Sequence, residues 1–229
     1  MKIIYCGKTK DVIEGDGATH LYFKDDMTGK DGVFDPGENQ VGLTVTGSGR
    51  SGLAVSRFFF EKLEANAIPT HYLSSDLEAR TMAVKSVTFF GHGLEMICRY
   101  RAAGSFLKRY GAYANEEQWL DGYVELTLKD DVRQDPFIGK DALILLGILN
   151  EAEYETVVRL TKQISSIIKE ELLKRGLELY DIKLEFGRER DTGAILLIDE
   201  LSAGNMRVYK DNEPVAPLEL EKLLLDNHE

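Results

Sequence analysis

The sequence predicts an α+β protein whose N-terminal part is an antiparallel sheet. Short apolar segments broken by Gly and Asp fill roughly the first 35 residues, which favours strands joined by turns. A long amphipathic segment near residues 151–175 predicts a helix, and an alternating segment after it predicts a hairpin. The 229 residues suit one large domain or two fused lobes. We expect an antiparallel-sheet lobe at residues 1–85 and an α+β lobe at residues 86–229.

The N-terminal lobe is expected to contain short strands followed by one helix. The strand candidates are "KIIYCG", "KDVIEG", "THLYFKDD" and "VGLTVT". The segment "LAVSRFFFEKLEANAI" predicts a helix, and Pro69 lies just beyond its expected end. "GSGRSG", residues 47–52, precedes this helix and matches the dinucleotide-binding pattern G-x-G-x-x-G. Because no strand–helix–strand succession surrounds it, we interpret it as a glycine-rich turn that begins the helix, with a phosphate contact left open.

The C-terminal lobe is expected to combine several strands with one long helix. The sheet candidates are a strand pair around Gly91 and Gly93, a strand in "GYVELTLKDD", and a hairpin formed by "LYDIKLEFG" and "AILLIDEL". Asn150 and Glu153 resemble a capping pair for the helix, and Gly176 can end it. The apolar residues on one face of this helix are Val157, Leu160, Ile164, Ile167, Ile168 and Leu172. "PLELEKLLLDN" predicts a short last helix.

The composition excludes several classes of protein. A net charge of −11 and a pI near 5.0 argue against a general nucleic-acid binder, but allow a small anionic ligand held by local cations. Cys6 and Cys98 form neither a zinc pattern nor a redox pair, and they fit a reducing compartment. No signal-peptide or bilayer-spanning segment is recognisable, so we expect a cytoplasmic protein without a membrane partner. Four scattered histidines are expected on the surface or in loops: His20, His71, His92 and His228.

The predicted hairpin contains an unusual set of charges. In "YDIKLEFG", Asp181, Lys183 and Glu185 alternate with apolar residues, so they share one face of the strand. If the loop centres near Arg190, Asp199 on the second strand lies opposite Asp181. Three carboxylates beside one lysine would repel one another, and Mg²⁺ would relieve that repulsion. The alternative is a solvated strand face with ordinary cross-strand ion pairs.

Other charged clusters recur along the chain. "GKTK" places Lys8 and Lys10 on one strand face, "LKDD" contains Lys129, and "CRYRAAGS" contains Arg99 and Ser105. Lysines over phosphates, acids on a metal and an Arg–Ser pair on a second anion are typical of a phosphoryl-transfer site. Each cluster alone is also compatible with ordinary surface charge.

Taken together, these segments resemble those of a known enzyme family. "GKTK", "FKDD", "RYRAAGS", "LKDDVRQDP", "YDIKLEFG" and "IDELS…R" occur in the order and at roughly the spacing seen in SAICAR synthetases, the phosphoribosylaminoimidazole-succinocarboxamide synthases of purine biosynthesis. The resemblance implies a two-lobed fold with an ATP-binding N-terminal lobe. It also implies a reaction in which ATP activates the carboxylate of carboxyaminoimidazole ribotide, the amine of L-aspartate attacks, and SAICAR, ADP and phosphate form.

The resemblance also implies roles for individual residues. Those expected at the ATP phosphates are Lys8, Lys10 and Lys129. Those expected at the ribotide phosphate or a substrate carboxylate are Arg99, Ser105 and Arg207. Those expected to bind Mg²⁺ are Asp181, Glu185 and Asp199. Lys183, on a substrate anion, and Asp199 are the expected catalytic residues. The partners are thus ATP, the carboxylated ribotide and an amino acid, and the oligomeric state, a homo-oligomer included, is left open.

Two segments depart from the family pattern. The family usually has Ser-Pro-Asp-x-x-Arg where this chain has "SAGNMR", residues 202–207, so an acid is missing. A family Gly-Lys-Gly with nearby asparagines corresponds to Gly47-Ser48-Gly49 followed by Leu53. Losing one buried polar partner costs about 1–3 kcal/mol of binding, enough to change substrate preference. A diverged paralogue that joins another carboxylate and amine is therefore one alternative, and a non-catalytic nucleotide-binding protein is another.

Overall fold

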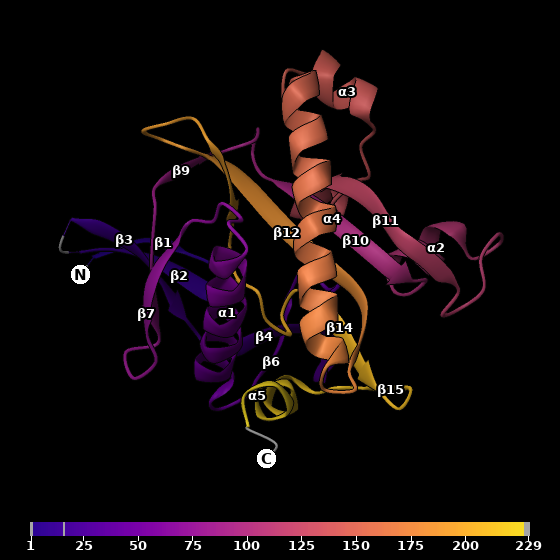
Figure 1. Ribbon diagram of the computed structural model, residues 1–229, viewed down its shortest axis with the longest axis horizontal. Helices are drawn as coiled ribbons and strands as arrows, with labels where there is room; N and C mark the ends of the chain where they lie inside the picture. The colour runs from indigo at the N-terminus through magenta and orange to yellow at the C-terminus, as the bar shows by residue number, and fades with distance from the viewer. Residues whose placement is uncertain (1, 16, 227–229) are drawn as a thin grey trace.

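A computed structural model describes residues 2–15 and 17–226 of the chain. Three antiparallel sheets and five α-helices are formed by these residues, and Figure 1 shows the N-terminal sheet on the left and the large C-terminal sheet running through the centre of the view. The expected α+β class with antiparallel sheets is confirmed. Within the described ranges, no helix combines the length and apolar character needed to cross a bilayer.

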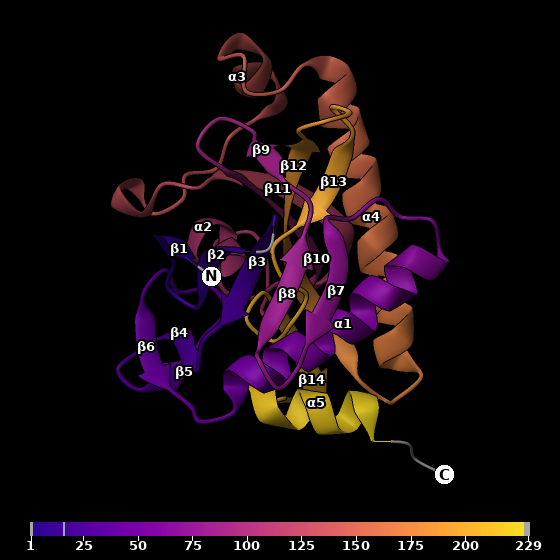
Figure 2. The same ribbon diagram turned by 90° about the vertical axis from the view of Figure 1, so that its left-hand side faces the viewer.

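The N-terminal sheet has five strands in the order β1-β2-β3-β8-β7. The strands are β1 (Lys2–Cys6), β2 (Lys10–Gly15), β3 (Ala18–Phe23), β7 (Tyr72–Asp76) and β8 (Thr81–Val84). A separate three-stranded sheet consists of β4 (Asp26–Lys30), β5 (Val33–Phe34) and β6 (Val41–Thr44). Helix α1 (Ser48–Ala65) follows and buries Leu53, Phe59, Phe60 and Leu63. Figure 2 shows the three-stranded sheet beside the N-terminal end of α1.

The C-terminal sheet is built around the long strand β12 (Glu178–Glu189). Its other strands are β9 (Val87–Phe89), β10 (Leu94–Arg101), β11 (Trp119–Leu128), β13 (Ile195–Ile198), β14 (Met206–Lys210) and β15 (Glu213–Pro214). Three short helical segments lie between strands, α2 (Ser105–Tyr110), the 3-10 turn η1 (Asp131–Arg133) and α3 (Lys140–Leu145). Helix α5 (Pro217–Leu225) packs against α1 near the C-terminus (Figures 1 and 2).

Helix α4 (Glu151–Leu173) covers one face of the C-terminal sheet, as Figure 1 shows. Asn150 and Glu153 form the predicted capping box, which satisfies backbone N–H groups at the helix start. The buried apolar residues of α4 include Val157, Leu160, Ile164, Ile168 and Leu172, as the helical periodicity predicts. They pack on buried sheet residues such as Met96, Ile182 and Leu184. Since strand side chains alternate, the opposite face of the same strands is free to be polar.

Several predicted boundaries differ from the structure. The strands flanking Gly91 and Gly93 do not pair with each other, because β9 and β10 both pair with β12. Helix α1 begins at Ser48, so "GSGRSG" forms its N-cap and first turns, as a glycine-rich helix start requires. Gly47 adopts φ +88°, a conformation that favours glycine. The last helix ends at Leu225, and Asn227 of the predicted segment lies outside the described residues. The lobe boundary at residue 85 stays a prediction.

Candidate functional site

The polar face of the C-terminal sheet contains an ordered set of charged residues. On β10 and β12, Glu95 faces Glu185 and Arg99 faces Asp181, and Asp181 faces Arg207 of β14 on its other side. These alternate with the apolar residues that contact α4, so strand geometry explains why "YDIKLEFG" has charges at every second position. Despite their charge, Glu95, Arg99, Asp181 and Glu185 are all buried. Burying these charges costs far more free energy than leaving them on a solvated strand face, because each buried charge needs a partner.

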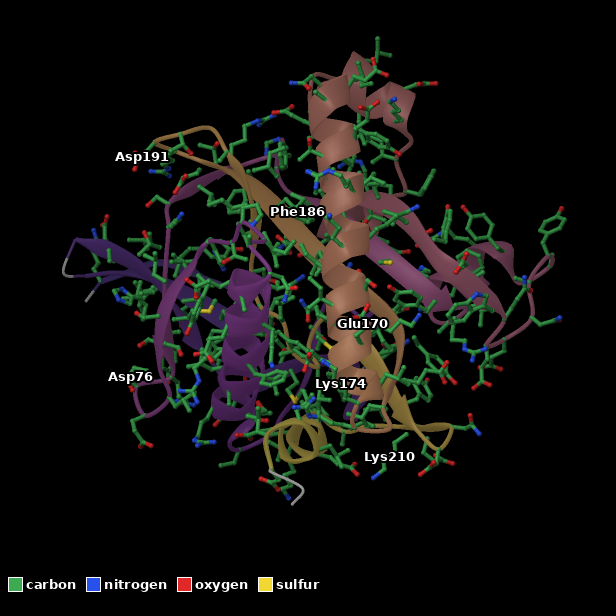
Figure 3. All side chains as sticks on the ribbon, viewed as in Figure 1. Asp76, Glu170, Lys174, Phe186, Asp191 and Lys210 are labelled. Atoms are coloured by element: carbon green, nitrogen blue, oxygen red, sulfur yellow. The ribbon has the colours of Figure 1, made fainter. Side chains whose placement is uncertain are left out.

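The predicted register of the hairpin is wrong. Arg188 pairs with Ile195 and Glu185 pairs with Ile198, so the turn centres between Asp191 and Thr192 instead of near Arg190. Asp191 lies at the tip of the hairpin in Figure 3. Asp199, just beyond the end of β13, is therefore close to Glu185 along the strand and not opposite Asp181.

The three acids predicted to bind one metal do not converge. Asp181 and Glu185 are four residues apart on one extended strand, which separates their Cα atoms by about 13 Å. Asp181 instead pairs with Arg99 at 2.7 Å and with Arg207 at 2.9 Å. Within residues 2–15 and 17–226, no group of three or more His, Cys, Asp or Glu side chains is arranged to hold a metal ion. Glu185 and Asp199 interact electrostatically, so a cation could lie between these two acids.

An arginine cluster occupies one end of the polar face. Arg99 is 1% exposed and donates to Glu125 (Nε, 2.8 Å), to Ser105 (Nη2, 2.8 Å) and to Asp181. Arg109, one turn after Ser105 on α2, also donates to Glu125. Arg99 and Ser105 are predicted site residues, whereas Glu125 and Arg109 were not predicted from the sequence. The alternation of β11, in which Glu125 and Thr127 share a face, was an available signal for Glu125.

Lysine–carboxylate pairs occupy the other end of the polar face. Lys10, from β2 of the N-terminal sheet, pairs with Asp199 at 3.2 Å and also with Glu200. Lys129 pairs with Glu185 at 2.6 Å, and Lys183 pairs with Glu95 at 3.0 Å. This cluster therefore joins the two sheets.

Lys8 differs from the other predicted lysines. It donates to Asp131 at 2.7 Å, and both side chains are exposed. Lys8 is thus held toward η1 and not in the cluster around Asp199.

The close spacing of these charges shifts their pKa values. Burial and then the negative charge of Asp199 raise the pKa of Glu185, although Lys129 opposes the shift. Burial also disfavours the charged form of Asp199, but Lys10 and Lys129 outweigh it and lower the pKa of this carboxyl. Burial alone would lower the pKa of Lys10, whereas Asp199 and Glu200 raise it. Glu185 and Asp199 therefore repel each other, and the positive charges of Lys10 and Lys129 offset this repulsion.

His71 lies in the loop between α1 and β7, as one of the two expected positions allows, but it is buried next to this cluster and not on the surface. The residue is 3% exposed, and its Nε2 lies 3.0 Å from the backbone carbonyl oxygen of Asp199. Burial lowers the pKa of His71 to about 4, so the ring is neutral and can donate from Nε2. Asp199 adopts φ +67°, a conformation that non-glycine residues seldom adopt. His71 thus donates a hydrogen bond to the carbonyl of Asp199, whose backbone is strained. This contact joins distant segments, and no local sequence pattern predicts it.

A cavity lies over the arginine end of the polar face. Five predicted site residues line it, namely Arg99, Ser105, Asp181, Lys183 and Arg207. Arg109, Thr127 and Asn205 are among its other lining residues. Segments far apart in the chain thus place three arginines and one lysine around one space.

Paired buried charges beside an arginine-lined cavity define an enzyme-type site for anionic ligands. The chain belongs to the SAICAR synthetase family, whose model matches residues 3–224. It is 59% identical over 227 residues to a phosphoribosylaminoimidazole-succinocarboxamide synthase of Clostridium tetani, an alignment that covers 99% of this chain and 100% of that protein. The protein of the same name from Finegoldia magna is 38% identical over 212 residues, covering 91% and 86%.

Solved structures agree with this assignment. The structure titled SAICAR synthetase (Type-2) in complex with ADP matches with a TM-score of 0.84 and 27% identity, over 97% of each chain. The structure described as protein TM1243, a SAICAR synthetase, matches with a TM-score of 0.78 and 33% identity, over 90% of this chain and 85% of that one. The resemblance noted from the sequence is confirmed.

Proposed function

We propose that this chain is a SAICAR synthase, an ATP-dependent carbon–nitrogen ligase. It joins L-aspartate to the carboxylate of carboxyaminoimidazole ribotide and releases SAICAR, ADP and phosphate. The 59% identity with a synthase, over nearly the full length of both chains, supports this activity and argues against a diverged paralogue. The observation that carries the chemistry is the position of Lys183, between Asp181 of the arginine cluster and Glu185 of the lysine cluster on β12.

The lysine end of the polar face is suited to nucleotide phosphates. Lys10 and Lys129 offer positive charge from the two sheets, and both are already held by acids that an incoming triphosphate can replace. Oxygen ligands from Glu185 and Asp199 fit Mg²⁺, which usually keeps waters and phosphate oxygens in its remaining positions. A bound Mg²⁺ would neutralise charge on the transferring phosphoryl group. Asp181, occupied by two arginines, is not part of this proposed pair.

The arginine end is suited to the ribotide. Arginine forms bidentate bonds with phosphate or carboxylate, and Arg99, Arg109 and Arg207 surround one cavity. Lys183 lies where the two ends meet, so we place there the carboxylate that first accepts a phosphoryl group and then the amine. The positive charge of Lys183 stabilises the negative charge that develops on the carboxyl oxygen when the amine attacks.

The departure at residues 202–207 has a local structural compensation. The Asn205 side chain accepts from the Ser202 backbone N–H at 2.9 Å and donates to the Glu200 carbonyl at 2.5 Å. Ser202 donates its hydroxyl to Glu200 at 2.5 Å, and a Cβ at Gly204 would lie 3.1 Å from Glu200 Oε1. The loop therefore closes tightly on Glu200, the partner of Lys10, without the family's acid.

The test is an assay of the purified protein with Mg²⁺, ATP, L-aspartate and the carboxylated ribotide. We expect SAICAR and ADP to form in equal amounts. If the protein binds nucleotide but forms ADP only when a different carboxylic acid or a different amine is supplied, the diverged paralogue is favoured. Nucleotide binding without turnover on any amine would favour a non-catalytic protein.

A further inference from the structure

A short segment of the N-terminal half crosses the cavity. Residues 35–39, between β5 and β6, are called the strap here, and Pro36, Gly37 and Asn39 of the strap line the cavity. At one end, Asp35 Oδ1 lies 2.8 Å from Arg207 Nη2 on β14. At the other end, the Asn39 amide donates to Asp135. The strap is thus bonded at both ends to residues that line the space in which we place the ribotide.

The guanidinium of Arg207 is fixed between two glycines. A Cβ at Gly104, which has φ +53°, would lie 2.6 Å from Arg207 Nη2, and a Cβ at Gly37 of the strap would collide with the same nitrogen. Backbone from two segments therefore limits movement of the guanidinium, so an incoming ligand must come to Arg207.

Arg207 has two acidic partners that differ in their freedom to move. Asp181 lies within β12, is 4% exposed and also pairs with Arg99. Asp35 lies in a loop, and its side chain is 40% exposed. When an anion needs the donors of Arg207, Asp35 is the partner that can leave, because water can solvate it and no second cation is paired with it among the described residues.

We propose that Asp35 is a specificity-determining counter-ion of Arg207, which the phosphate monoester of the substrate displaces. A monoanionic carboxylate has no charge advantage over Asp35, whereas a phosphate dianion does, so Asp35 excludes weak anions from the cavity. Displacement breaks the side-chain contact between the strap and Arg207, while the Asp35 backbone stays bonded to Thr28 of β4. This inference rests on the proposed function only in assuming that the phosphorylated substrate occupies this cavity.

The test compares wild type with Asp35→Asn by calorimetric titration of ribose 5-phosphate and, separately, of acetate. Removing the competing charge should tighten ribose 5-phosphate binding on the order of fivefold, the scale of one partly exposed ion pair. Acetate binding should tighten by a larger factor, so that discrimination between the two anions falls. Asp31→Asn, which removes the same charge from an exposed turn before the strap, should leave both affinities unchanged.

Three results would overturn the inference. The first is that ribose 5-phosphate binds Asp35→Asn no more tightly than wild type. The second is that it binds wild type and Arg207→Ala equally well. The third is that, at millimolar concentration, it binds neither wild type nor Asp35→Asn. Thermal unfolding of each variant establishes that it is folded. Failure of the proposed function is separate, because a protein that binds ribose 5-phosphate as described but forms no SAICAR would retain this role of Asp35.

Discussion

The two ends of the polar sheet face solve different electrostatic problems. At the arginine end, Arg99 is almost fully buried and bound on three sides, and Arg207 is packed between glycines. At the lysine end, the Lys129 side chain is 48% exposed, and flexible point charges face acids that repel each other. A planar arginine held rigidly suits recognition of one fixed anion, whereas lysines can follow a phosphoryl group as its charge moves. The comparison predicts different consequences for mutations at the two ends.

The largest effect on turnover is expected from Asp199→Asn at the lysine end. Loss of one of two oxygen ligands for Mg²⁺ should lower kcat roughly a thousandfold or more. Asparagine tolerates the left-handed conformation of residue 199, so the fold should persist. SAICAR formation and thermal unfolding check both statements, with Asp191→Asn at the hairpin tip as a control. Near-normal turnover of Asp199→Asn would refute the metal role.

The largest effect on stability is expected from Arg99→Met at the arginine end. The change leaves Glu125 and Asp181 buried beside fewer cations, which should cost about 3–5 kcal/mol of unfolding free energy. Arg101→Met, which breaks a partly exposed pair with Glu178 and exposed contacts with the Glu117 carbonyl and Trp119, should cost about 1 kcal/mol. Urea denaturation measures both values. Equal losses for the two variants would show that burial does not distinguish these ion pairs.

His71 makes the stability of the lysine end depend on pH. Its pKa in the folded protein, about 4, is below the ordinary 6.5, so the unfolded chain binds a proton first as pH falls. The free energy of unfolding should therefore decrease between pH 6.5 and 4, by about 3 kcal/mol in total. His71→Gln can retain a donor to Asp199 but does not titrate, so it should lack this component. Denaturation curves at pH 7 and 4.5, without metal or nucleotide, give the difference, and parallel losses in both proteins would contradict the prediction.

The smallest predicted effects are opposite changes in KM. Arg207→Ala should raise KM for the ribotide about tenfold and leave KM for ATP nearly unchanged, because a charged contact with one substrate is lost. Lys129→Ala should raise KM for ATP more than KM for the ribotide. Steady-state assays with each substrate varied in turn measure the pattern. A similar rise of both constants in either variant would remove the proposed division of the sheet face.

Local patterns in the sequence predicted much of the fold. Helix α4 was identified from its apolar spacing and the Asn150–Glu153 pair, since both signals lie within one segment. The charges of β12 were identified from alternation. The hairpin register was not predicted correctly, because it depends on the position of the turn. The observed turn lies further along the chain, so the neighbour of Asp199 on β12 is Glu185 and not Asp181.

The remaining site residues could not be found from local patterns. Glu125 contacts Arg99 across neighbouring strands, and His71 contacts Asp199 at a separation of 128 residues. Asp35 meets Arg207 at a separation of 172 residues. These contacts are set by the way the two sheets pack. The motifs of the family resemblance identified Arg99, Asp199 and Arg207, but not Glu125, His71 and Asp35, which contact them.

The most direct test of the division between the two ends is a crystal structure with Mg²⁺ and ADP. We predict phosphate oxygens beside Lys10 and Lys129, a metal ion bound by Glu185 and Asp199, and Asp181 still paired with Arg99 and Arg207. A metal ion on Asp181, or nucleotide phosphates among the arginines, would contradict this account.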